Sequence, residues 1–213
     1  MINKIIYFSG SSSSGKSTTI NFIKEELNKK GFTNIIDYSE IIRNIPEVKN
    51  KSIDELRKNS HEYLMIEDKI IREKIEQEKS AILDNNSDKI YLFDRCITDS
   101  LYYLISYTEK SKFIENDYII YSNLINHIID HINFLKSCII QFHTRFSLLE
   151  FLPMDINAQT EDMRPKNIEI LKKSEYNIIS IFNSYFENIR TYIKCDSDNF
   201  NYKINTFIDY ILQ

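Results

Sequence analysis

The sequence predicts an α/β fold in which a parallel β-sheet is covered by helices on both faces. Short, continuous apolar runs alternate along the chain with longer amphipathic segments. Such runs are typical of strands buried on both faces, and their alternation with helices favours parallel strands joined by helical crossovers. The 213 residues are 42% hydrophobic and 27% charged, which fits one globular domain over residues 1–213.

Five segments are expected to be strands because each is a short run rich in apolar residues. They are residues 5–8, 35–38, 90–93, 138–142 and 191–193. Helices are expected where apolar residues recur every three or four positions. The first expected helix begins after Gly15 and ends near Gly31. Further helices are expected over 53–79, 99–108, 117–136, 168–186 and 204–211.

The most specific motif follows the first expected strand. Residues 10–17 read Gly-Ser-Ser-Ser-Ser-Gly-Lys-Ser and fit the pattern G-x-x-x-x-G-K-S/T without a mismatch. In this pattern backbone N–H groups surround the phosphates, the lysine reaches the β- and γ-phosphates, and the last hydroxyl ligates Mg²⁺. Only 3 glycines occur in the chain and two hold motif positions, which disfavours a merely connecting Ser/Gly loop. The expected nucleotide-binding residues are Gly10, Ser11, Ser12, Ser13, Ser14, Gly15, Lys16, Ser17 and Thr18.

A second pair of candidate residues ends the third expected strand. Asp94 follows the apolar run 90–93, and Arg95 comes directly after it. A strand beside the phosphate-loop strand delivers an acid to the metal site in such proteins, so Asp94 and Ser17 are the expected metal residues. Arg95 is a fixed cation suited to binding a phosphoryl group. The plainer alternative is that Asp94 only caps the end of a strand.

Residues 94–103 resemble the D-R-x-x-x-D-S-x-x-Y signature of thymidylate kinases and their relatives. The resemblance is closest to the P-loop kinases grouped with the ribosylnicotinamide kinase domain of bacterial NAD-biosynthesis proteins. Glu40 and Arg43 are similar to the E-x-x-R element of that group. Residues 161–164 are similar to its lid sequence D-D-G-x-R, although Met163 replaces the glycine. The resemblance implies a doubly wound sheet of about five parallel strands, ATP with Mg²⁺, and a small acceptor.

The leading hypothesis is therefore a kinase that moves the γ-phosphoryl group of ATP to a nucleoside, nucleotide or ribosyl-type acceptor. Lys16, with Mg²⁺ on Ser17, would hold the donor, and Asp94 would orient metal-bound water or the acceptor. GTP remains an alternative donor. Arg95 would offset charge on the transferred group.

The acceptor side has two alternative assignments. If the acceptor is a hydroxyl, Glu40 is the expected general base and Asp37 is the second candidate. If the acceptor is a phosphate, no strong base is needed, and Arg43 becomes a clamp for it together with Arg95.

Residues 145–165 are expected to form an irregular loop or lid. The segment contains Pro153 and Pro165 and is long for a connection in a compact domain. Arg164 is the expected lid cation, because it ends the stretch that resembles a kinase lid. Arg145 is expected to anchor adenine or a neighbouring carboxylate.

Other charged and metal-binding patterns are interpreted more simply. The run Lys69–Lys79 is expected to be a solvated helix face with pairs four residues apart. His127 and His131 have a spacing that can bind zinc, but no third ligand is evident, so a plain helix is favoured.

Composition and cysteine usage limit the classes of protein to which the chain can belong. The net charge of −4 gives no broad basic surface, which weighs against nucleic acid as the main partner and favours a small-molecule substrate. Three separated cysteines without a Cys-x-x-Cys pair indicate reduced thiols in the cytoplasm. No stretch is long enough to span a bilayer. The oligomeric state stays open, with a homodimer among the alternatives.

Two other functions compete with the kinase hypothesis. The chain could be a nucleotide-switched protein that hydrolyses ATP or GTP slowly while its lid contacts a protein or lipid partner. It could also be a polynucleotide end kinase, against which the acidic net charge counts.

Overall fold

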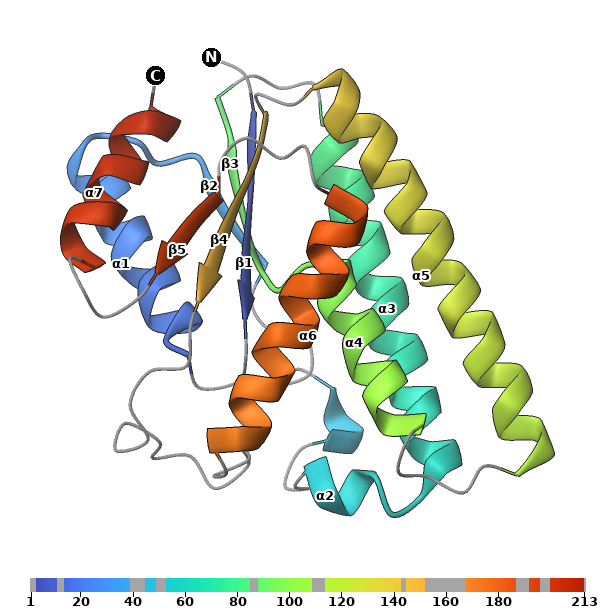
Figure 1. Cartoon of the computed structure of the whole chain (residues 1–213). Coiled ribbons are helices and arrows are strands. Elements are labelled where there is room, and N and C mark those ends of the chain that lie inside the picture. The colour runs from blue at the N-terminus through green and yellow to red at the C-terminus, as the bar shows by residue number, and fades with distance from the viewer. Residues whose placement is uncertain are drawn as a thin grey trace.

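In the part of the chain that the structure describes, five parallel strands form the central sheet of the computed structural model (Figure 1). Their order is β2-β3-β1-β4-β5, so the strand that precedes the phosphate loop lies in the middle. The strands are β1 (Lys4–Gly10), β2 (Ile35–Tyr38), β3 (Ile90–Asp94), β4 (Phe146–Phe151) and β5 (Tyr192–Cys195). The predicted doubly wound α/β class is confirmed.

The structure describes most of the chain, in ten stretches. They are residues 3–10, 14–38, 45–48, 53–84, 88–108, 114–142, 145–151, 168–186, 192–195 and 200–212. Among these residues, no helix combines the length and the apolar character needed to cross a membrane.

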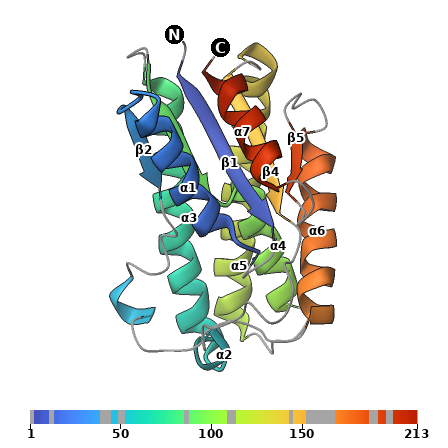
Figure 2. The same cartoon turned by 90° about the vertical axis from the view of Figure 1, so that its left-hand side faces the viewer.

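Helices cover both faces of the sheet (Figures 1 and 2). One face carries α1 (Lys16–Lys29) and α7 (Phe200–Ile211), which lie in front of the sheet in Figure 2. The other face carries α3 (Ser60–Leu83), α4 (Ile97–Thr108), α5 (Glu115–Gln141) and α6 (Ile168–Phe186). The short helix α2 (Ile53–Leu56) and a 3-10 turn at Pro46–Val48 precede α3.

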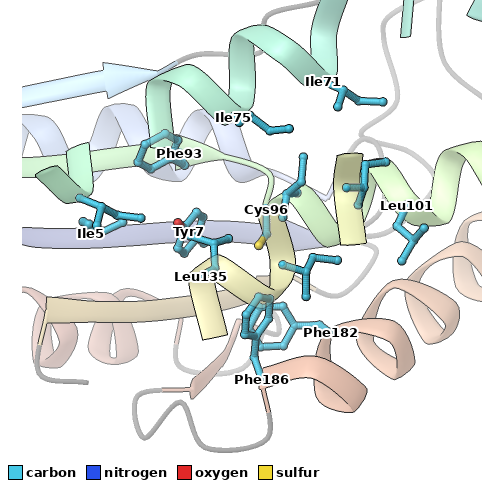
Figure 3. Packing of buried hydrophobic residues seen from close by; sticks show 14 of the residues in the cluster. Ile5, Tyr7, Ile71, Ile75, Phe93, Cys96, Leu101, Leu135, Phe182 and Phe186 are labelled. Atoms are coloured by element: carbon cyan, nitrogen blue, oxygen red, sulfur yellow. The ribbon is translucent and has the colours of Figure 1, made fainter. Parts of the chain in front are cut away.

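Alternate side chains of β1 enter two separate hydrophobic cores. Ile6 and Phe8 pack with apolar residues of α1 and α7, whereas Ile5 and Tyr7 pack with those of α3 to α6. All four are at most 1% exposed, as a strand buried on both faces requires. Figure 3 shows Tyr7 beside Phe93 in the larger of the two cores.

Two residues mark helix ends in ways that the sequence indicates. Gly31, just beyond α1, has a φ of 83°, which glycine adopts without the strain that a Cβ would add. Asn59 caps α3, because its side chain accepts a hydrogen bond of 3.2 Å from the backbone N–H of Glu62.

The predicted strand over 138–142 is wrong, because these residues form the end of α5 and the position after it. Cys138 and Ile139 are buried but Ile140 is 64% exposed, which is a helical pattern. The fourth strand is instead β4, which lies inside the expected loop 145–165. Short apolar runs do not distinguish a strand from the last turns of a helix, so apolar content alone predicts a strand where α5 ends and misses β4.

Candidate nucleotide-binding site

The phosphate-loop motif lies at the carboxyl end of the central strand β1. Gly10 and Gly15 have φ values of 138° and 88°, conformations that side chains with a Cβ rarely adopt. Helix α1 begins at Lys16, whose ammonium donates to the carbonyl of Gly10 at 3.1 Å and to the Ser14 hydroxyl at 3.3 Å. The Lys16 side chain thus folds back against the loop, where its ammonium could also bind a phosphate held by the loop.

A hydroxyl and a carboxylate meet beside the loop. The Ser17 hydroxyl donates to Oδ2 of Asp94 at 3.0 Å, although the two residues are 77 positions apart. Asp94 ends β3, and register pairing places it opposite Phe8 of β1. Its other oxygen, Oδ1, is buried without a hydrogen-bond partner. A hydroxyl beside an oxygen with an unused lone pair suits Mg²⁺, which binds one or two protein oxygens and keeps several waters.

Arg95 is held in a strained conformation at the start of the turn from β3 to α4. Its φ is 86°, which is uncommon for a residue with a side chain, and its backbone N–H donates to the carbonyl of Phe8 at 2.9 Å. Its guanidinium lies over the Tyr103 ring, with 4.9 Å between the Arg95 Cζ and the ring centroid, and donates to the Tyr103 hydroxyl. The cation therefore extends along α4.

A buried charge cluster, which we call the α3–α4 cluster, adjoins this turn. It consists of Glu67 and Lys74 on α3, Asp99 on α4, and Arg95. Glu67, Lys74 and Asp99 are 7%, 5% and 0% exposed. Burial raises the pKa of both carboxyl groups above their ordinary values, and the positive charges of Lys74 and Arg95 oppose that rise. The cations thus compensate a carboxylate pair that burial disfavours.

We expect Lys74→Met to destabilise the fold more at neutral than at acidic pH. A carboxyl group whose folded pKa lies above its unfolded pKa loses stability as the pH rises through the folded value. Without the Lys74 charge, the pKa values of Asp99 and Glu67 rise further, so the loss grows above their ordinary range. We expect a loss of about 2 kcal/mol near pH 7.5, shrinking toward pH 4.5.

Denaturant unfolding of wild type and variant across this pH range measures the difference. Lys79→Met, an exposed position on the same helix, is the matched control. A pH-independent difference for Lys74→Met would contradict the role of its charge.

Several predicted site residues lie outside the described part of the chain. They are Ser11, Ser12, Ser13, Glu40, Arg43 and Arg164, together with residues 152–167 of the expected lid. Thr18, the last residue of the predicted loop, is exposed on α1.

Two predicted side chains form contacts outside the phosphate loop. Asp37 forms an ion pair of 2.7 Å with Lys24 of α1, so it lies on the α1 face of the sheet. Its assignment as the second candidate base stays a prediction. Arg145 precedes β4 at the opposite edge and donates to backbone carbonyls of Asn3, Ala81 and Ile82 at 3.3–3.4 Å. It stabilises the end of α3 and is not placed to anchor a nucleotide.

The interpretation of Lys69–Lys79 as a solvated face is partly wrong, because Lys74 and Glu78 are buried. Glu78 forms a hydrogen bond of 2.6 Å with Nε2 of His131, whose direction depends on the proton position. His131, one of the two histidines considered above as zinc ligands, therefore belongs to the core. Lys74 and Glu78 are four residues apart on one helix face, and Glu67 lies seven residues before Lys74. This spacing of charged residues on one helix face is the feature of the sequence that could have indicated their burial.

Comparisons with known proteins agree with this geometry. A family model described as an AAA domain matches residues 5–124, more than half of the chain. No curated protein matches the sequence.

Two solved structures of NadR protein are similar over 100% of the chain. One is in complex with NR, with a TM-score of 0.67 and 14% identity, and the other is in complex with NAD and AMP-PNP, with a TM-score of 0.61 and 15% identity. The chain covers 52% and 50% of those two proteins, so it spans about half their length. At these identities the likeness shows a shared fold.

Proposed function

The chain belongs to the AAA domain family, and from this membership and the site geometry we propose that it is an ATP-dependent phosphotransferase. It moves the γ-phosphoryl group to a small nucleoside, nucleotide or ribosyl-type acceptor. The observation that carries the proposal is the pairing of Ser17 with Asp94 at 3.0 Å beside Lys16. This arrangement joins a phosphate loop to a metal-side carboxylate, which phosphoryl transfer requires.

The phosphate loop would bind the phosphoryl donor, ATP. Backbone N–H groups at the start of α1 face the phosphates, and Lys16 exchanges its contacts with Gly10 and Ser14 for phosphate oxygens. Mg²⁺ held by Ser17 and Asp94 would neutralise charge on the β- and γ-phosphates. Catalysis of this kind rests on positioning and charge neutralisation.

We infer that the acceptor binds on the α3–α4 side of the loop. Arg95 leaves the strand that ends in Asp94 and extends along α4 to Tyr103, toward Glu67 of α3. A cation in this position meets the acceptor or the transferred group. For a hydroxyl acceptor, Glu40 remains the first candidate base and Asp37 the second, and Arg43 is the candidate clamp for a phosphate acceptor.

A coupled ADP-release screen tests the proposal. Nucleosides, nucleoside monophosphates and nicotinamide riboside are each added to the protein with ATP and Mg²⁺. We expect one of these compounds to raise ADP release well above the background. A slow rate that no acceptor changes would instead support a nucleotide-switched binding protein.

We expect Arg164→Ala to lower kcat with the true acceptor about tenfold or more while changing ATP affinity little. A lid cation contacts the transferred group mainly in the closed complex, so its loss appears in kcat. Steady-state kinetics and calorimetric ATP titration separate the two quantities. Full kcat in the variant would rule out Arg164 as the lid cation.

A further inference from the structure

Asp99 is a buried carboxylate in the first turn of α4 that the proposed chemistry does not use. Its side chain is 0% exposed, and its Oδ1 accepts a hydrogen bond of 2.7 Å from the Ser9 hydroxyl. Ser9 is itself 3% exposed and is the residue directly before Gly10. This bond connects positions 90 residues apart in the sequence, at the point where β1 becomes the phosphate loop.

A second hydrogen bond fastens the same two segments one residue away. The backbone N–H of Arg95 donates to the carbonyl of Phe8 at 2.9 Å. Asp99 also donates its backbone N–H to the carbonyl of Cys96 at 3.0 Å, which closes the first turn of α4. The turn from β3 to α4 is therefore fixed to the end of β1 by one backbone contact and one side-chain contact.

The side-chain contact bears on the metal residues, because Asp94 stands on this turn and Ser17 on the helix that follows the loop. Their oxygens are 3.0 Å apart only while the turn and the loop keep their relative position. A small displacement of either segment alters the spacing on which shared coordination of one ion depends.

We propose that Asp99 is a positioning residue. Through its hydrogen bond to Ser9, it holds the phosphate loop and the Asp94 turn at the spacing that Ser17 and Asp94 need to bind one Mg²⁺. In this proposal Asp99 acts through the Ser9 hydroxyl and touches neither the nucleotide nor the metal itself. It sets the geometry of residues that do. This role rests on the proposed function, because it concerns Mg²⁺ bound with ATP at this loop.

The test measures binding, without turnover. The affinity of the ATP analogue AMP-PNP is measured by calorimetry in EDTA and in saturating Mg²⁺, and the ratio of the two affinities is the Mg²⁺ enhancement. Because Mg²⁺ binds the analogue in solution equally in every experiment, differences in this ratio between variants reflect the protein's own contribution to binding Mg²⁺.

We expect Asp99→Ala and Ser9→Ala each to reduce the Mg²⁺ enhancement about tenfold, with the affinity in EDTA changed little. The double variant should lose no more than either single variant, because both remove the same contact. Asp99→Asn keeps an acceptor for the Ser9 hydroxyl and should retain most of the enhancement. Asp130→Ala, at an exposed position on α5, is the matched control and should equal wild type.

The outcomes separate the two proposals. If wild type does not bind AMP-PNP with Mg²⁺, the proposed function fails. If wild type binds and both Ser9→Ala and Asp99→Ala keep the full enhancement, the positioning role is overturned. An equal loss of affinity in EDTA and in Mg²⁺ also overturns it, because that pattern reports general loosening of the loop. Should Asp99→Ala not fold, Ser9→Ala alone decides, since it deletes one oxygen.

Discussion

Asp94→Asn is expected to lower kcat about a hundredfold or more while leaving AMP-PNP affinity in EDTA within a few-fold of wild type. The substitution preserves the shape of the side chain and removes its negative charge. The Ser17 hydroxyl keeps an acceptor at the end of β3, so the fold of the site should persist. What is lost is the anionic oxygen that would orient Mg²⁺ and its waters at the transferred phosphoryl group.

Steady-state kinetics with the acceptor from the ADP-release screen give kcat, and calorimetry gives the affinity. Asp130→Asn, on the exposed face of α5, controls for a general effect of removing one carboxylate. Turnover near the wild-type value would mean that Asp94 only caps the end of its strand.

Lys16→Ala is expected to weaken binding of ATP with Mg²⁺ by one to two orders of magnitude. A charge-assisted contact of this kind contributes roughly 1.5–3 kcal/mol, which corresponds to about 10- to 150-fold in affinity. Lys16 is 5% exposed and bonded to Gly10 and Ser14, so its removal also frees the loop. Thermal unfolding measured beside the titration shows whether the fold survives.

Lys136→Ala, at an exposed position on α5, is the control for loss of one positive charge. Its affinity for ATP should equal that of wild type. If Lys16→Ala also binds ATP with wild-type affinity, the phosphate-loop assignment is wrong.

The parts of the site that could be predicted are those in which chemistry requires a fixed local pattern. The loop from Gly10 to Ser17 needs glycines at two positions and a lysine and hydroxyl at its end, so the motif identifies it. The predicted family is confirmed by the match over residues 5–124. The expectation that Asp94 approaches the loop is consistent with its contact to Ser17, because adjacent parallel strands end at the same edge of the sheet.

The parts that could not be predicted depend on contacts between distant segments. Asp99 contacts Ser9 across 90 positions. Asp99 belongs to the signature in residues 94–103, but that local pattern does not indicate that its carboxylate faces the end of β1. Lys74 and Glu67 look like surface residues in a charged helix, since burying them is favourable only beside compensating charges on other elements. The exchange of strand 138–142 with β4 has a related cause, because apolar content alone does not fix the backbone conformation.

Transfer of label from ATP carrying ³²P in its γ-phosphate to the acceptor found in the screen tests the central claim most directly. The account predicts that label appears on the acceptor in proportion to the ADP formed, and that Asp94→Asn abolishes most of this transfer. Label that appears only in inorganic phosphate, at a rate independent of any acceptor, would contradict the phosphotransferase assignment.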